Sequence, residues 1–269
     1  MAIDGEARRR LRRRREARGI PLRSFAPNAV TALALCSGLT AVRFAVSAQW
    51  EQAVVMIMIA AILDGLDGRI ARLLHGESRF GAELDSLSDA ISFGVSPALV
   101  LYLWALVSAP RIGWMFALVY AVFCALRLAR FNARIDVTEQ PHKSAGFLTG
   151  VPSPVGAGLA LLPLYLWLWT EEPMLRSPWL VAPWLAFVAV LMVSSLATYS
   201  WASVRLRRNI RFEAIVVVVA IGAALLSAPW PTLSVVCLLY LISLPFSASS
   251  YLKIRRLRAS APEPAPDDH

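Results

Sequence analysis

The chain has 269 residues, of which 57% are hydrophobic and only 17% are charged, and its mean hydropathy is +0.57. Soluble domains carry about 25% charged residues, so this composition excludes a disordered chain and disfavours a soluble enzyme. The net charge of +9 is typical of proteins that contact nucleic acid or an anionic membrane, and the apolar content favours the membrane. The three cysteines and three histidines are widely spaced, which gives no zinc-ligand pattern and no disulfide framework.

Apolar runs of about 20 residues, long enough to cross the hydrocarbon core as helices, recur along the whole chain. They predict an all-α fold, a polytopic transmembrane helical bundle with about eight spans. The predicted spans are 27–47, 51–74, 82–107, 112–131, 153–170, 179–201, 212–227 and 232–251. We expect an Arg-rich cytoplasmic segment at 1–26, a transmembrane core at 27–205, a C-terminal transmembrane hairpin at 206–252 and a disordered cytoplasmic tail at 253–269.

Positive residues are segregated along these predicted spans. The N-terminal segment, alternate connections and the C-terminal end hold 24 of the 27 lysines and arginines, which leaves Arg43, Arg111 and Arg176 for the opposite side. By the positive-inside rule, both termini and the basic connections are cytoplasmic. The positive residues are therefore expected to set the orientation in the membrane and to contact lipid head groups. We expect no nucleic-acid partner.

Acidic residues are concentrated at one place in the chain. Six of the 18 fall between positions 64 and 89, near the predicted cytoplasmic ends of the second and third spans. Asp64 and Asp67 share one helix face at i and i+3, and Asp85 and Asp89 share a face of the next helix at i and i+4. A short turn joins these helices, so the four carboxylates can converge.

Four converging carboxylates repel one another unless cations bind between them. Carboxylate oxygens suit hard ions, so the pattern predicts two divalent cations, Mg²⁺ or Mn²⁺, and paired ions of this kind support displacement at phosphorus. Gly68, Gly81 and the small Ala71 would let a bulky ligand approach the backbone, and Arg72 and Arg79 could bind phosphate oxygens. The alternative interpretation is that the glycines permit helix packing and the arginines mark the membrane interface.

The residues around the aspartates resemble the motif of the CDP-alcohol phosphatidyltransferase family. That motif reads D-x-x-D-G-x-x-A-R, a spacer, then G-x-x-x-D-x-x-x-D, and every fixed position is present between Asp64 and Asp89. Segments at 125–132, 150–154 and 194–200 are similar to bacterial phosphatidylserine synthases, although Ala197 stands where proline is expected. The resemblance covers most of residues 25–205, so it identifies this segment as the transferase core.

The resemblance implies that the hydroxyl of L-serine attacks the β-phosphate of CDP-diacylglycerol, giving phosphatidylserine and CMP. The four motif aspartates would hold the metals, and Asp89 would also be the catalytic general base. The residues that would bind the CDP-lipid are Asn28, Thr31, Asp64, Gly68, Ala71, Arg72, Arg79, Gly81 and Asp85. Candidates for binding serine are Arg127, Arg130, Asn132 and Ser153, although the two arginines are equally consistent with positive-inside anchoring.

The family further implies a multi-pass protein of the bacterial inner membrane. We expect it to form a homodimer and to contact membrane lipids. Two alternatives stay open. The acceptor could be another alcohol of the family, such as glycerol 3-phosphate, inositol phosphate or choline. A more remote alternative is a cation transporter, which would need carboxylates near the midplane and access from both sides.

Overall fold

The computed structural model describes residues 22–74, 76, 78–133, 147–194, 197–199 and 211–259. Its helices are α2 (Leu22–Val46), α3 (Trp50–Leu74), α4 (Arg79–Asp89), α5 (Ser96–Trp104), α6 (Pro110–Asn132), α7 (Ser153–Ala160), α8 (Leu162–Thr170), α9 (Pro178–Val193), α10 (Arg211–Ser227) and α11 (Pro229–Ala259). A π-helical segment, Ala90–Val95, joins α4 to α5, and short 3₁₀ turns lie at Leu106–Ser108 and Pro173–Arg176. The predicted all-α bundle is confirmed.

Each predicted span corresponds to one helix or to consecutive helices. Within the described residues, four helical stretches are long and apolar enough to cross a membrane: Phe25–Val46, Arg79–Trp104, Pro110–Asn132 and Ser153–Thr170. Shorter apolar helices cover Pro178–Val193, Val216–Ser227 and Pro229–Pro245. The second predicted span, α3, carries Asp64, Asp67, Arg69 and Arg72 in its second half, so its apolar stretch is short.

Proline sets the starts of several helices. The first turns of α6, α7, α8 and α9 contain Pro110, Pro154, Pro163 and Pro178. The N–H groups of a first turn have no acceptor within the helix, so a proline there costs no hydrogen bond. The end of α8 is formed by Glu171 in the left-handed conformation, with a φ of 55°. These local signals produce sharp turns between apolar helices.

The sixth predicted span is shorter than expected. The helix α9 ends at Val193 rather than near Trp201, and the Ser194 hydroxyl donates to the Leu191 carbonyl at 2.7 Å. Strand β2 (Ala197–Tyr199) follows and pairs antiparallel with β1 (Phe147–Thr149), with Leu148 opposite Thr198. Pairing between the two strands supplies the backbone hydrogen bonds that a longer α9 would have made within the helix.

Near both chain ends, the observed helix ends differ from the predicted segment boundaries. The helix α2 begins at Leu22, inside the predicted N-terminal segment, and α11 continues to Ala259, past the predicted boundary at 252. The Arg-rich residues before Leu22 and the Pro-rich residues after Ala259 lie outside the described residues.

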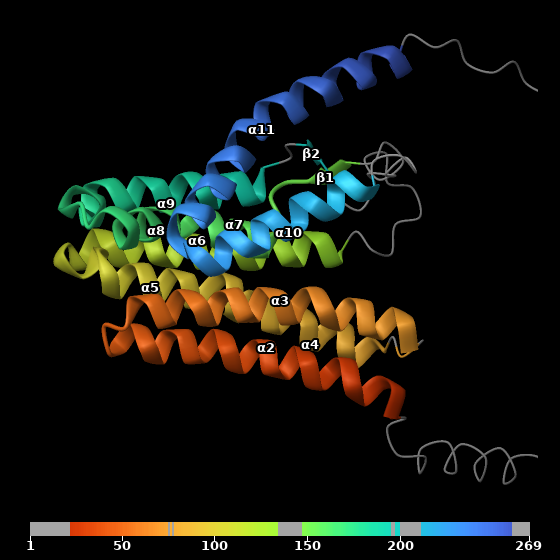
Figure 1. Cartoon of the computed structure of the whole chain (residues 1–269), viewed down its shortest axis with the longest axis horizontal. Coiled ribbons are helices and arrows are strands. Elements are labelled where there is room, and N and C mark those ends of the chain that lie inside the picture. The colour runs from red at the N-terminus through yellow and green to blue at the C-terminus, as the bar shows by residue number, and fades with distance from the viewer. Residues whose placement is uncertain are drawn as a thin grey trace, which may run out of the picture.

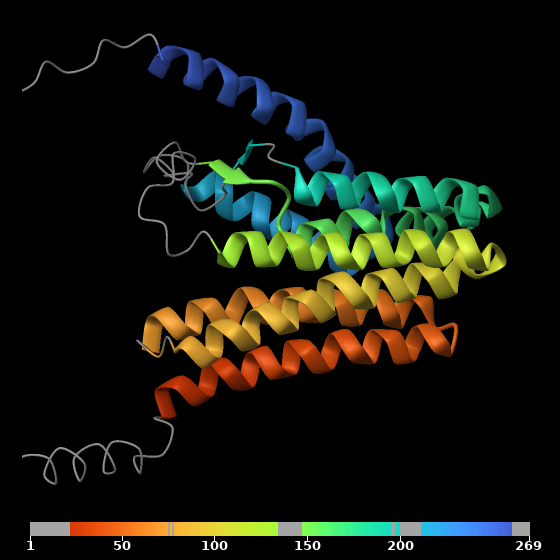
Figure 2. The same ribbon diagram turned by 180° about the vertical axis from the view of Figure 1, so that it is seen from behind.

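The helices form two adjacent groups (Figures 1 and 2). In the first group α2 packs along α3, and α4, the π-helical segment and α5 pack against α2. In the second group α6 packs along α9, α7 lies beside α9, and α11 lies on α8. The π-helical segment and α5 also contact α6, so the third predicted span joins the two groups. The buried core includes Trp104, Tyr120 and Tyr165.

Candidate metal and nucleotide site

The second half of α3 and the second half of α4 carry the motif aspartates. The Gly76 amide donates to the Ala71 carbonyl at 3.0 Å, within the short connection between the helices. Ser78 then begins α4 as its N-cap residue, and its hydroxyl accepts the Gly81 amide at 3.0 Å. The connection is therefore tight enough to return the chain directly antiparallel to α3.

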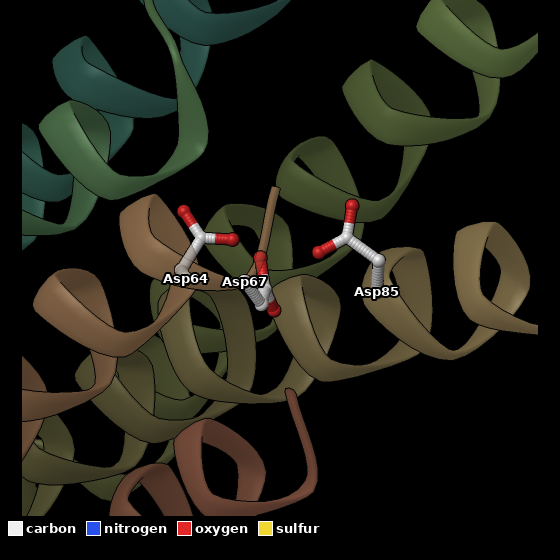
Figure 3. Close-up of side chains that lie close together, drawn as sticks. All are labelled: Asp64, Asp67 and Asp85. Carbon is white, nitrogen blue, oxygen red and sulfur yellow. The ribbon is translucent and has the colours of Figure 1, made fainter. Parts of the chain in front are cut away.

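Three of the four aspartates converge as the spacing predicts. Each of Asp64, Asp67 and Asp85 offers one carboxylate oxygen, and these oxygens all lie within 4.8 Å of one another. Figure 3 shows Asp64 and Asp67 extending from α3 and Asp85 extending from α4 into a common space. The fourth, Asp89, is the last residue of α4 and lies close enough to Asp64, Asp85 and Arg127 for their charges to interact.

This donor set fits hard divalent cations. All the ligand atoms are carboxylate oxygens, and Asp67 is only 5% exposed. Among the described residues, Asp64, Asp67 and Asp85 form no ion pair with lysine or arginine. Buried carboxylates without a cationic partner are costly, and a bound Mg²⁺ or Mn²⁺ would compensate for their charge.

The first helix supports the site through Thr31, a buried residue of α2. The Thr31 hydroxyl donates to Asp67 Oδ2 at 2.6 Å and also lies 3.0 Å from the Pro27 carbonyl. On the other side, the Ser88 hydroxyl donates to the Thr31 carbonyl at 3.3 Å. One residue of α2 thus contacts both helices that carry the aspartates, and it holds Asp67 in a fixed direction.

A cavity of about 400 Å³ opens beside the aspartates, between the start of α2, the end of α3 and the start of α4. Predicted nucleotide-binding residues supply most of its walls, namely Asn28, Thr31, Gly68, Ala71, Arg72, Gly81 and Asp85, together with Asp67. Asp64 and Arg79, the other two predicted CDP-lipid residues, are not among its lining residues.

The two motif glycines have different surroundings. A Cβ on Gly68 would meet no atom within 4 Å, so this position faces open space. A Cβ on Gly81 would lie 2.7 Å from Asn28 Oδ1 and 3.1 Å from Ser78 Oγ, so here glycine permits close contact between α4 and α2. Gly81 therefore fits the helix-packing interpretation, and the open space beside Gly68 leaves room for the ligand that the other interpretation expects.

Sequence reasoning missed four lining residues: Pro27, Gly76, Ser78 and Ala82. Ser78 carried a usable signal, because a serine directly before an amphipathic helix is a preferred N-cap and its side chain must lie at the helix start. The remaining three are small or apolar and offered no chemical signal of their own.

The four candidate serine-binding residues do not form one cluster. Arg127 Nη1 donates to Ser153 Oγ at 2.6 Å, and Arg127 is electrostatically coupled to Asp89. The buried Nε of Arg127 has no hydrogen-bond partner among the described residues. Arg130 instead donates to the Val193 carbonyl at 3.2 Å, and Asn132 Nδ2 donates to Ser86 Oγ at 2.8 Å. Arg127 and Ser153 therefore lie beside the aspartates, whereas Arg130 lies at the end of α9.

Because Thr31 bonds to one proposed metal ligand, its replacement should weaken metal binding. We expect Thr31→Val to lower the affinity for Mn²⁺ by about 10- to 100-fold, the usual cost of losing a partner that orients a ligand. Thr31→Ser keeps the hydroxyl and should retain affinity near that of the unsubstituted protein. Titration of the purified protein with Mn²⁺, followed by electron paramagnetic resonance, measures this, and equal affinities for both variants would contradict the role of the hydroxyl.

Comparison with known proteins agrees with this geometry. The family model described as CDP-alcohol phosphatidyltransferase matches residues 24–194, more than half of the chain. A second model, described as CDP-alcohol phosphatidyltransferase 2, matches residues 209–245, which include the whole of α10 and the first half of α11.

Curated relatives cover the same region and more. The CDP-diacylglycerol–serine O-phosphatidyltransferase of Mycobacterium tuberculosis is 40% identical over 233 residues, covering 87% of this chain and 81% of that protein. The protein of the same name from Mycobacterium leprae is 39% identical over 221 residues, covering 82% and 73%. That of Helicobacter pylori is 40% identical over 142 residues, covering 53% and 57%. With its aspartates, cavity and motif in place, the chain belongs to the CDP-alcohol phosphatidyltransferase family.

Proposed function

We propose that this protein transfers the phosphatidyl group of CDP-diacylglycerol to the hydroxyl of L-serine, giving phosphatidylserine and CMP. The observation that carries the proposal is the convergence of Asp64, Asp67 and Asp85 beside a cavity wide enough for part of a nucleotide. The names of the mycobacterial and Helicobacter relatives support serine as the acceptor.

Two divalent cations, Mg²⁺ or Mn²⁺, fit the four motif aspartates. When bound, they would supply positive charge to the diphosphate oxygens and to the departing CMP. Asp64, Asp67 and Asp85 supply converging oxygens, and Asp89 completes the set through its contact with Asp64. The cavity wall formed by Asn28, Gly68, Ala71, Arg72 and Gly81 would hold the CDP moiety, with Arg79 at the start of α4 available to the phosphates.

Asp89 is the residue best placed to act as general base. A serine hydroxyl is a weak nucleophile at neutral pH and needs a base within hydrogen-bond reach. In the proposed step the serine oxygen forms a bond to the β-phosphorus of CDP-diacylglycerol as its proton passes to Asp89. The bond from that phosphorus to the oxygen of CMP then breaks, and CMP leaves.

Arg127 and Ser153 would orient the acceptor. The Arg127 guanidinium lies near enough to Asp89 for their charges to interact, and its Nε, which has no hydrogen-bond partner among the described residues, leaves a donor for the serine carboxylate. A guanidinium can bind a carboxylate through two parallel hydrogen bonds, so the Nε edge suits this ligand. Asn132, through Ser86, adjoins the same segment of α4, whereas Arg130 donates to the Val193 carbonyl and is given no part in binding the acceptor.

A substitution of Arg127 should therefore affect serine more than the lipid substrate. We expect Arg127→Gln to raise the KM for serine by about 10- to 100-fold, the equivalent of one lost hydrogen bond to a charged group, with little change in the KM for CDP-diacylglycerol. Arg130→Gln is the matched control, three residues along α6, and its serine KM should stay close to the wild-type value. Serine titrations of CMP release measure both. Equal increases in the two variants would contradict the assignment.

We further propose that the site faces the cytoplasm from a bacterial inner membrane, with both termini on the same side. Arg69, Arg72 and Arg79 lie at the end of the bundle that holds the aspartates, whereas Arg43 lies in the last turn of α2 and Arg176 in the 3₁₀ turn before α9. This segregation supports a cytoplasmic site by the positive-inside rule. It also favours the transferase over a transporter, which would place its carboxylates near the midplane. A homodimer is proposed from family likeness alone.

The acceptor is tested by supplying purified protein with CDP-diacylglycerol, Mn²⁺ or Mg²⁺, and one alcohol at a time. We expect CMP release with L-serine and only background release with glycerol 3-phosphate, inositol phosphate or choline. Release with glycerol 3-phosphate and not with serine would overturn the serine assignment while leaving the family chemistry intact.

A further inference from the structure

The helix that carries Asp85 and Asp89 changes its winding directly after the second of these residues. Residues Ala90–Val95 are π-helical, and the Ser96 amide donates to the Ile91 carbonyl, five residues earlier. Such segments are rare and occur as single wide turns, often at functional sites. The wide turn therefore lies between the aspartates on α4 and the buried residues of α5.

The sequence explains why the turn is wide. In an α-helix the Phe93 carbonyl would accept the amide of residue 97, but Pro97 has no N–H and its ring would collide with that carbonyl. The hydroxyl of Tyr120 on α6 donates to the Phe93 carbonyl at 3.0 Å. Tyr120 is 0% exposed and Phe93 is 1% exposed, so the tyrosine supplies a donor that water cannot.

Neighbouring helices hold the turn from two sides. A Cβ on Gly94 would lie 3.1 Å from the Cys124 Cβ, so α6 approaches the turn closely and brings Tyr120 within reach. On the α2 side, the Ser92 hydroxyl donates to the Ala34 carbonyl at 3.3 Å, and Gly38 packs directly against Ser92. These contacts leave little room for the π-helical turn to convert to an α-helical one.

We propose that Tyr120 is a positioning residue for the aspartates, acting through the π-helical turn that it stabilises. One residue occupies about 100° of an α-helix, so replacing the wide turn with an ordinary one would rotate the aspartate-bearing segment against α5 by roughly that angle. Because Trp104 and Leu101 fix α5 in the core, the rotation would displace Asp85 and Asp89. The inference rests on the proposed function where it is tested by kcat. Mn²⁺ affinity tests it independently of that function.

The test compares three variants of the full-length protein in lipid nanodiscs. Tyr120→Phe removes only the hydroxyl. Tyr165→Phe is the matched control, since Tyr165 is a buried tyrosine on α8, outside the turn and outside the helices that carry the aspartates. The double variant Tyr120→Phe with Pro97→Ala restores an amide that can bond to the Phe93 carbonyl in an ordinary α-turn. Each is assayed for kcat and KM of serine-dependent CMP release, Mn²⁺ affinity and melting temperature.

For Tyr120→Phe we expect kcat to fall by about 10- to 100-fold, as misplacement of catalytic groups by about 1 Å does, with the KM for serine nearly unchanged. Its Mn²⁺ affinity should fall as well, whereas Tyr165→Phe should retain both kcat and Mn²⁺ affinity. In the double variant the melting temperature should recover because the carbonyl has a donor again. Its kcat should stay low because the turn has rewound.

Two results would overturn the proposal: wild-type kcat in folded Tyr120→Phe, or recovery of kcat together with the melting temperature in the double variant. If Tyr120→Phe does not fold, the double variant decides alone, since low kcat in the folded protein supports the proposal and wild-type kcat overturns it. If the wild-type protein shows no serine-dependent CMP release, the proposed function fails separately. Mn²⁺ affinity then decides, because equal values in Tyr120→Phe and Tyr165→Phe would overturn the positioning role.

Discussion

Replacing Asp89 with asparagine is expected to lower kcat for CMP release by about 10²- to 10⁴-fold, the usual contribution of a general base. Asparagine has nearly the same shape as aspartate but cannot accept the serine proton. The loss should be larger still to the extent that Asp89 also binds metal. Asp89 ends α4 beside Asp64, so the substitution removes a charge and a proton acceptor from the site while keeping the size of the side chain.

The matched control for this prediction is Glu83→Gln on the same helix. Glu83 is exposed and occupies a variable position of the motif, so the same change of acid to amide should leave kcat close to wild type. Melting temperatures of both variants establish that they are folded. A kcat for Asp89→Asn within about tenfold of wild type would exclude the base role, because that loss is smaller than general bases contribute.

Removal of divalent cations should abolish activity entirely. After treatment with a chelator, CMP release is expected to fall to background, and Mg²⁺ or Mn²⁺ should restore it. The physical reason is that Asp64, Asp67 and Asp85 each hold one carboxylate oxygen within 4.8 Å of the others, so a divalent cation between them would offset their repulsion. Zn²⁺ should restore activity poorly, since it favours nitrogen and sulfur ligands in tetrahedral geometry.

Metal binding should also raise the melting temperature, because a ligand that binds only the folded protein stabilises it by about 2.7 kcal/mol at 100 times its dissociation constant. Asp64→Asn should lose most of this stabilisation, which links the effect to the motif rather than to lipid. Full activity in chelator-treated protein with no measurable bound metal would contradict the account.

The aspartate site is the part of the molecule that the sequence predicted best. Helical spacing placed Asp64 with Asp67 and Asp85 with Asp89, and a short connection between apolar spans made the two helices antiparallel neighbours. Local rules of this kind sufficed because each pair lies on a single helix. The partner of Asp67 was not predictable in the same way, since Thr31 is 36 positions away and the hydrogen bond depends on how α2 packs.

The surroundings of α6 show where sequence reasoning ends. Arg127 and Arg130 are three residues apart and looked equivalent, yet one donates to Ser153 and the other to the Val193 carbonyl. Their difference arises from the packing of α7 and α9 on α6, which spacing along one helix does not encode. The π-helical turn was missed for a related reason, because Pro97 signals a disturbed helix but its form depends on Tyr120.

Transfer of the phosphatidyl group to serine is tested most directly by supplying purified protein in nanodiscs with CDP-diacylglycerol, Mn²⁺ and ¹³C-labelled L-serine. The lipid and nucleotide products are followed by mass spectrometry. We predict labelled phosphatidylserine and CMP in equal amounts, both absent when serine is omitted. CMP accompanied by phosphatidic acid, without any labelled phosphatidylserine, would contradict the claim, because water rather than serine would then be the acceptor.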